Sequence, residues 1–145
     1  MKRILFFGLL LFACSNANAQ LPQIQITAVF PAGAQQGSSV DVAITAGSNM
    51  DEAAELVFSH PGLSATAKLD AKGEPIANQF VVSVSADTQP GLYDVRLKGL
   101  FGISNPRIFR VDTLPEIQEA EPNNTPAQAQ TVAINSIVNA RSNGA

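Results

Sequence analysis

The chain has 145 residues, a formal net charge of −3 and 14% charged side chains, against about 25% in typical soluble domains. The acidic balance argues against nucleic acid or an anionic membrane surface as a partner. One cysteine and one histidine exclude an intramolecular disulfide, a cysteine-cluster zinc site and any metal site built on several histidines. The length allows one domain of ordinary size with appendages.

The N-terminus is typical of an export signal. A positively charged start precedes an apolar run over residues 4–13, which is too short to cross a hydrocarbon core of about 30 Å. Ala17 and Ala19 form the small-x-small pattern that signal peptidase requires, with cleavage before Gln20. Residues 1–19 are therefore predicted to be a cleaved signal peptide helix.

A second interpretation of the same region involves lipidation. The stretch ending at Cys14 resembles a bacterial lipobox, in which Cys14 becomes the lipid-bearing first residue of the mature protein. Phe12 is bulky for that motif, so ordinary cleavage is favoured and the lipoprotein is the alternative. Either route predicts an exported protein, located in the periplasm, at the cell surface or outside the cell. No later segment is apolar for 18 residues, so no further membrane span is predicted.

From residue 23 onward, apolar and polar residues alternate with a period of two, which indicates half-buried β-strands. Seven short strands are predicted, over residues 24–30, 40–44, 55–59, 64–69, 80–84, 93–97 and 108–111. The last is the weakest, because its apolar residues fall on both faces. Turn-forming Gly, Pro and Asn residues separate the strands. A helical turn is predicted only over residues 50–56.

This spacing predicts an all-β protein, a seven-stranded immunoglobulin-like β-sandwich over residues 23–112, because there is no room for crossover helices. Tyr93, the only tyrosine, stands where a tyrosine corner would place it, two residues before the inward position Val95. In that feature the Tyr hydroxyl bonds backwards to the preceding corner, here the turn containing Asp87 and Gly91. We interpret these three residues as structural.

The first half of this region resembles a known family. Residues 26–33 and 37–50 are similar to the opening of IPT/TIG-type immunoglobulin-like domains, with a Pro-Gly turn, a second Gly turn, an alternating strand and a Gly-x-Asn turn. Met50 stands where those domains usually have an aromatic residue or Leu, and residues 56–58 resemble their next strand. The resemblance covers residues 23–112 and implies a fold rather than an activity.

The C-terminal part begins with an acidic, Pro-containing stretch over residues 113–126, whose composition predicts an extended linker. Residues 119–130, which overlap its end, resemble the entry to a bacterial pre-peptidase C-terminal domain, which often opens with Glu-x-Asn-Asn/Asp-Thr. Residues 127–145 are then interpreted as the truncated start of such a domain, with expected strands at 131–134 and 136–138. So short a segment cannot bury a core, and we expect residues 119–145 to be poorly ordered alone.

The two resemblances together are similar to large exported proteins of planctomycete-like bacteria, in which an immunoglobulin-like module precedes a pre-peptidase domain. They imply that the chain is a fragment of a longer polypeptide. Its expected partners are other domains of that polypeptide or envelope proteins.

Candidate ligand residues are few. Asp51, Glu52 and Glu55 are three carboxylates within five positions, a weak candidate for Ca²⁺ because the spacing lacks the pattern of a dedicated calcium loop. A solvated acidic turn is the favoured interpretation. His60 precedes a Pro-Gly turn and is predicted to be a solvated loop histidine. Phe101, in a Gly-Leu-Phe-Gly turn, is the best candidate for an exposed aromatic residue that stacks on a glycan.

No catalytic signature occurs: there is no Gly-x-Ser-x-Gly, no phosphate-binding Gly-rich loop and no His-Glu-x-x-His. We therefore expect no enzyme activity and no cofactor. The leading hypothesis is a non-catalytic exported module for spacing, docking or recognition within a larger envelope or extracellular protein. The alternative is an accessory N-terminal region of a secreted peptidase whose catalytic domain lies elsewhere. Surface glycan binding is a third hypothesis.

Overall fold

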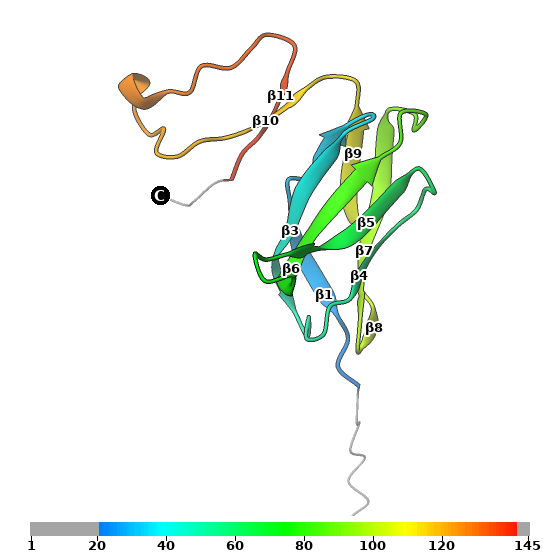
Figure 1. The fold of residues 1–145 in the computed structure, drawn as a ribbon. Coiled ribbons are helices and arrows are strands. Elements are labelled where there is room, and N and C mark those ends of the chain that lie inside the picture. The colour runs from blue at the N-terminus through cyan, green and yellow to red at the C-terminus, as the bar shows by residue number, and fades with distance from the viewer. Residues whose placement is uncertain (1–20, 142–145) are drawn as a thin grey trace, which may run out of the picture.

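The computed structural model describes residues 21–141. The residues proposed for signal cleavage and lipidation, Cys14, Ala17, Ala19 and Gln20, lie outside that range. The described chain is all-β and forms an immunoglobulin-like sandwich of two sheets, followed by an extended tail (Figure 1). The predicted fold class is thus confirmed.

The first sheet is antiparallel throughout and has the order β1-β3-β6-β5. Its strands are β1 (Gln25–Phe30), β3 (Ser39–Ser48), β6 (Pro75–Val84) and β5 (Leu63–Leu69). The second sheet has the order β2-β9-β7-β4, with β8 paired to β7. Its strands are β2 (Gly33–Gln35), β9 (Arg107–Asp112), β7 (Gly91–Gly99), β4 (Glu55–Phe58) and β8 (Gly102–Ile103).

The predicted strands are all present, but the predicted number of seven is too low. The structure adds β2, which pairs in parallel with β9, and β8, which folds back on β7. Both are too short to show a period of two, so only their partners define them. The helical turn predicted over residues 50–56 is wrong. Asp51 and Glu52 form a tight turn, Glu52 has a φ of 52°, and β4 begins at Glu55.

The alternating residues of facing strands fill the space between the sheets. Val42 and Ile44 of β3 point inward together with Phe80, Val82 and Val84 of β6. The second sheet contributes the buried residues Leu56, Val95, Leu97, Phe109 and Val111. The ambiguous strand over 108–111 is resolved by this packing, because Phe109 is fully buried while Ile108 is 53% exposed.

A side chain joins the two sheets where their backbones do not pair. Asn105 Oδ1 accepts from the backbone N–H of Ile26 at 2.8 Å, and Asn105 Nδ2 donates to the Ile26 carbonyl at 2.9 Å. Ile26 is fully buried, so without Asn105 these two backbone groups would lie unpaired away from water. The amide of Asn105 therefore replaces a missing ladder partner for β1.

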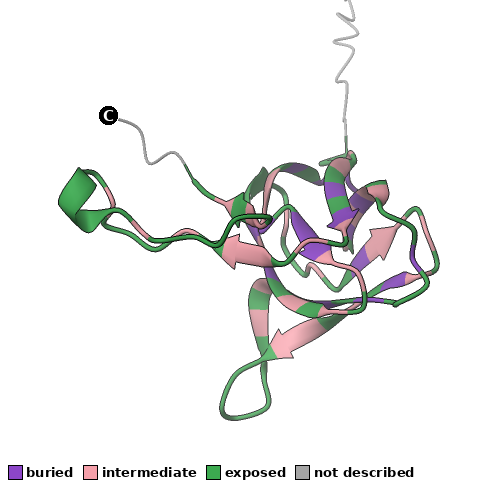
Figure 2. Cartoon of the chain, turned by 90° about the horizontal axis from the view of Figure 1, so that it is seen from above, coloured by how far each residue is buried: buried purple, intermediate pink, exposed green. Residues whose placement is uncertain are grey.

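The tail contains β10 (Glu116–Gln118), a short 3₁₀ helix η1 (Pro126–Gln128) and β11 (Ile137–Asn139). β10 and β11 pair in parallel, and the chain between them forms a long excursion (Figure 1). No residue from 113 to 141 is buried (Figure 2). The strand expected at 131–134 is not formed within the described chain, and the one expected at 136–138 begins at Ile137.

Candidate functional site

The predicted tyrosine residue closes the corner that leads into β7. Tyr93 Oη donates to the Gln89 carbonyl at 2.6 Å, which is the backward bond of a tyrosine corner. Gly91 begins β7, directly after this corner. Asp87 is exposed and its backbone N–H donates to Ser85 Oγ. These contacts are internal to the fold, and the Tyr93 hydroxyl proton is used within the corner.

His60 is not the solvated loop histidine that its turn predicted. The residue is half-buried, and its ring lies 5.1 Å from that of Tyr93, centroid to centroid. Its Nδ1 accepts from the Gly62 N–H at 3.0 Å, which assigns the ring proton of a neutral imidazole to Nε2. His60 therefore packs into the corner region.

The calcium candidate is not brought together. Within residues 21–141 no group of three or more His, Cys, Asp or Glu side chains lies close enough to hold a metal ion. Glu55 instead pairs with Lys98, with Oε2 and Nζ 3.0 Å apart. Asp51 and Glu52 remain exposed at a turn. The proposed ligand set of Asp51, Glu52 and Glu55 is therefore wrong for this fold.

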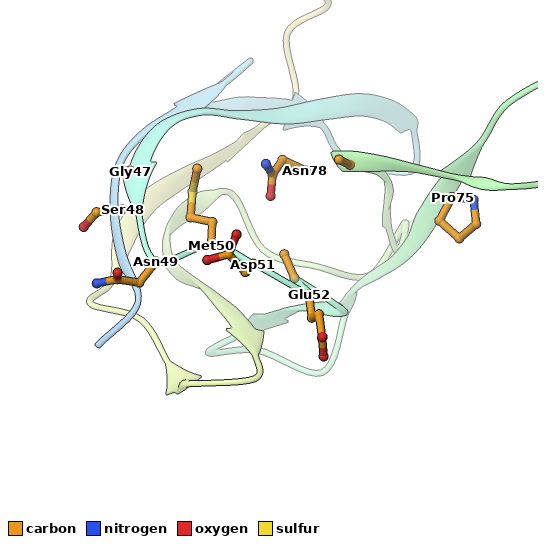
Figure 3. A pocket seen from close by; sticks show the side chains of 10 residues that line it. Gly47, Ser48, Asn49, Met50, Asp51, Glu52, Pro75 and Asn78 are labelled. Atoms are coloured by element: carbon orange, nitrogen blue, oxygen red, sulfur yellow. The ribbon is translucent and has the colours of Figure 1, made fainter. Parts of the chain in front are cut away.

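Asp51 and Glu52 do, however, line a hollow of about 550 Å³ at one end of the sandwich (Figure 3). We call it the notch and define it by residues 47–53 together with Pro75, Ala77 and Asn78. One wall is the end of β3 and the turn after it, and the other is the beginning of β6. Its volume lies within the range typical of ligand sites.

The notch exists because two strands separate. β3 and β6 pair from Ser39↔Ser83 as far as Ala43↔Gln79. Asn78, the next residue of β6, has a left-handed φ of 58°, and β6 beyond it pairs only with β5. Residues 44–48 of β3 keep β1 on one side and have no strand partner on the other within the described chain. The open edge of β3 therefore reaches the hollow at Gly47 and Ser48.

The turn after β3, which forms part of one wall of the notch, is held by hydrogen bonds and by packing. Asn49 Nδ2 donates to the Gln23 carbonyl at 2.9 Å, and the Ala54 N–H donates to the Lys98 carbonyl at 3.0 Å. Met50 packs against the core beneath the notch. A Cβ on Gly47 would lie 2.5 Å from Met50 Sδ and would clash with the backbone carbonyl oxygen of Gln25, so glycine is required there for close approach.

Polar groups without partners in the described chain occur in the lining of this site. Asn78 Oδ1 is buried and has no hydrogen-bond partner among the described residues. Asp51 and Glu52 make no ion pair within the same part of the chain. The lining contains no Lys, Arg or His. The notch is thus acidic and rich in hydrogen-bond acceptors.

Asn78 is not among the predicted site residues, although its residue type and position indicate an irregular strand. Asn is depleted in β-strands, and Asn78 lies just before the strand predicted over residues 80–84. An Asn at the edge of a strand tolerates the left-handed conformation and can redirect the chain. Only the structure shows that the redirected strand opens a hollow beside Asp51 and Glu52.

The glycan-stacking candidate Phe101 is half-buried and packs against the core. The exposed side chains of its hairpin are Leu100, at 60%, and Ile103, at 57%. An aromatic platform needs an exposed ring, and packing against the core covers part of the Phe101 ring. Phe101 is therefore better explained as part of the packing.

A second polar cluster ties the tail together. Glu119 accepts from Asn123 Nδ2 at 2.6 Å and from the Arg141 N–H at 3.0 Å. Asn139 Nδ2 donates to Glu116 Oε2 at 2.5 Å. Partial burial raises the pKa of Glu116 above its ordinary value, and this hydrogen bond only partly offsets the effect. The hydrogen bonds of the cluster join segments of the tail to one another, although Glu116 Oε1 is buried and has no hydrogen-bond partner among the described residues.

No helix in the described part of the chain has the length and apolar character needed to span a membrane. No family model matches the sequence, and no curated protein matches it either. Among solved structures, the chain is similar to SGBP-B of the Bacteroides ovatus mixed-linkage glucan utilization locus, solved in complex with a mixed-linkage heptasaccharide. The TM-score is 0.42 at 16% identity, and the alignment covers 68% of this chain and 24% of that one. A likeness of this degree says nothing about what this chain binds.

Proposed function

We propose that the chain is a non-catalytic, exported immunoglobulin-like module that spaces and docks the parts of a larger envelope or extracellular protein. The observation that supports this most is the placement of its two ends. The chain enters β1 at one end of the sandwich, and the tail leaves β9 at the opposite end (Figure 1). A rigid sandwich between the two would hold whatever precedes and follows it apart.

Contacts at the exit support a defined direction for the tail. Gln35 Nε2 donates to the Thr113 carbonyl at 2.9 Å, and Asp112 Oδ1 accepts from the N–H groups of Thr113 and Leu114. Farther along, the Arg141 guanidinium lies 3.9 Å from the ring centroid of Phe30, a cation–π contact. These contacts return the tail to the sandwich, as a docked connection requires.

The tail also has features of a partly built module. β10 and β11 form a two-stranded pair, and each has one edge without a partner in the described chain. A pair of this kind is marginal alone and offers its free edges to further strands. This agrees with the proposal that residues 127–145 begin a pre-peptidase C-terminal type of domain in a longer polypeptide.

The intact mass of the native protein in the exported fraction tests the proposal. A mass well above that of residues 20–145 is expected, with peptides from this chain and from further modules in one polypeptide. A mass equal to residues 20–145 would contradict the proposal. Mapping of the additional peptides also separates the two hypotheses, because a peptidase catalytic domain among them would favour the accessory role.

A further inference from the structure

The notch has properties that a role as a spacer between modules does not explain. Three of the four non-glycine residues with positive φ in the described chain, Asn49, Glu52 and Asn78, lie in its lining. Such a conformation is common for Asn, but it is strained for Glu. The turn that carries Glu52 is nonetheless held rigidly, by the bonds of Asn49 and Ala54 described above.

We propose that the notch binds an extended peptide segment that carries a lysine or arginine side chain. This proposal rests on the docking function above and names the class of partner. The open edge of β3 over residues 44–48 offers backbone N–H and C=O groups to such a segment, in the manner of β-strand addition. A side chain from that segment would then enter the hollow.

Charge complementarity identifies the side chain. Asp51, Glu52 and the buried Oδ1 of Asn78 are all acceptors, and no cation of this chain neutralises them within residues 21–141. An ammonium or guanidinium group supplies several donors and no acceptor, so it can bond to Asn78 Oδ1 while the negative charges of Asp51 and Glu52 attract it. A carboxylate in the same place would be repelled. A neutral apolar side chain would leave Asn78 Oδ1 without a partner.

Burial of the amide oxygen makes the site selective. Asn78 Oδ1 is shielded from solvent, so a bond to it forms in a medium of lower dielectric constant than water. Asp51 and Glu52 are exposed at the rim, where they attract a cation but contribute less per contact. Affinity is therefore expected to depend on both the rim carboxylates and the backbone edge of β3.

A peptide titration tests the proposal. The ¹⁵N-labelled protein, exported and purified after natural processing, is titrated with acetyl-Val-Lys-Val-amide and followed by amide chemical shifts. We expect saturable shifts confined to residues 44–53 and 77–78. The peptide with norleucine in place of lysine is expected to bind at least tenfold more weakly, and n-butylamine, an amine without peptide groups, is not expected to saturate the site.

Matched variants make the test specific. Glu52→Gln is expected to weaken binding about fivefold or more, and Asp51→Asn provides a second variant at the same rim. Glu74→Gln is the control, since Glu74 is an exposed carboxylate outside the lining; its affinity should match that of the unaltered protein. Unchanged shifts away from the notch show that each variant is folded.

Several outcomes would overturn the proposal: no saturable shift, equal affinity for the lysine and norleucine peptides, or equal effects of Glu52→Gln and Glu74→Gln. Saturation by butylamine at the same concentration would show that the notch binds a free amine rather than a peptide, which would also overturn the proposal. The titration measures only binding at the notch, whereas the mass of the native product shows only whether this chain is part of a longer polypeptide. Failure of one is therefore distinct from failure of the other.

Discussion

The sandwich and the tail of this chain are both built from strands, yet different forces hold them. The sandwich encloses a core that includes Phe80 and Phe109, which are 2% and 0% exposed. The tail, residues 113–141, has no buried residue and depends on polar contacts such as Glu116–Asn139. Hydrogen bonds contribute only about 1 kcal/mol each, net of water, whereas burial of apolar area is the main driving force of folding. We therefore expect the tail to detach without unfolding the sandwich.

The strongest test of this difference is a cavity in the core. Phe109→Ala is expected to lower the free energy of unfolding by about 3–5 kcal/mol, because a fully buried ring in contact with Phe58 is lost. Urea denaturation measures the change. The matched control in the tail is Val138→Ala, at a side chain that is 43% exposed, with an expected effect within about 0.5 kcal/mol. Similar losses from both variants would contradict the comparison.

The bond between the sheets gives the next largest effect. Asn105→Ala is expected to cost about 2 kcal/mol or more, because the buried N–H and C=O of Ile26 both lose their partner. Thermal or urea unfolding provides the measurement. Asn124→Ala in the tail, at an exposed position, should leave stability within about 0.5 kcal/mol. If Asn105→Ala leaves the free energy of unfolding unchanged, water has replaced the amide of Asn105 as the partner of Ile26.

The tyrosine corner is predicted to contribute less. Tyr93→Phe removes the hydroxyl that donates to the Gln89 carbonyl and keeps the ring, so a loss of about 1 kcal/mol is expected. Tyr93→Leu, which also removes the contact with the His60 ring, should cost more. Equal unfolding midpoints for Tyr93→Phe and the unaltered protein would mean that the bond only shapes the corner.

The smallest effect concerns the pH dependence of the tail. Partial burial raises the pKa of Glu116, so the docked tail holds this proton more tightly than a released tail would. Docking is therefore strongest at low pH and weakens as the pH rises through the raised pKa. Ionisation of Asp112 has the opposite effect on stability. The hydrogen bonds from Arg110 and from the Leu114 N–H lower its pKa, and its contribution is lost as the pH falls.

Carboxyl ¹³C titration, together with exchange protection of the Ile137 amide, measures the effect of Glu116. Glu116→Gln is expected to remove the loss of protection with rising pH, because the uncharged amide carries no desolvation penalty for ionisation. Glu74→Gln, in the turn between β5 and β6, should leave the dependence intact. Protection that does not change with pH in the unaltered protein would refute the role of Glu116.

Some features of the fold could be predicted because they are local. Alternation puts Val42 and Val82 on an inward face wherever their strands pair, since side chains of a strand point to opposite faces in turn. The position of Tyr93, two residues before inward Val95, was likewise a local signal. The tail was rightly expected to lack a core, because so few residues cannot enclose one.

Other features depended on residues far apart in the sequence. Asn105 bonds to Ile26 across 79 positions, and nothing near Asn105 indicates that partner. The short strand β2 exists only through β9. The acidic turn was noticed, but Glu55 was wrongly grouped with Asp51 and Glu52, because β4 places it beside Lys98 instead.

The all-β class, the inward faces of the strands and the tyrosine at the corner can be predicted from local sequence, because each follows from a period of two or from a turn within a few residues. The pairing of the sheets, the bond of Asn105 and the notch follow only from the folded arrangement. The notch arises where β3 and β6 separate at Asn78. A site made from the ends of two strands and a turn is defined by how those elements meet, and that depends on long-range packing.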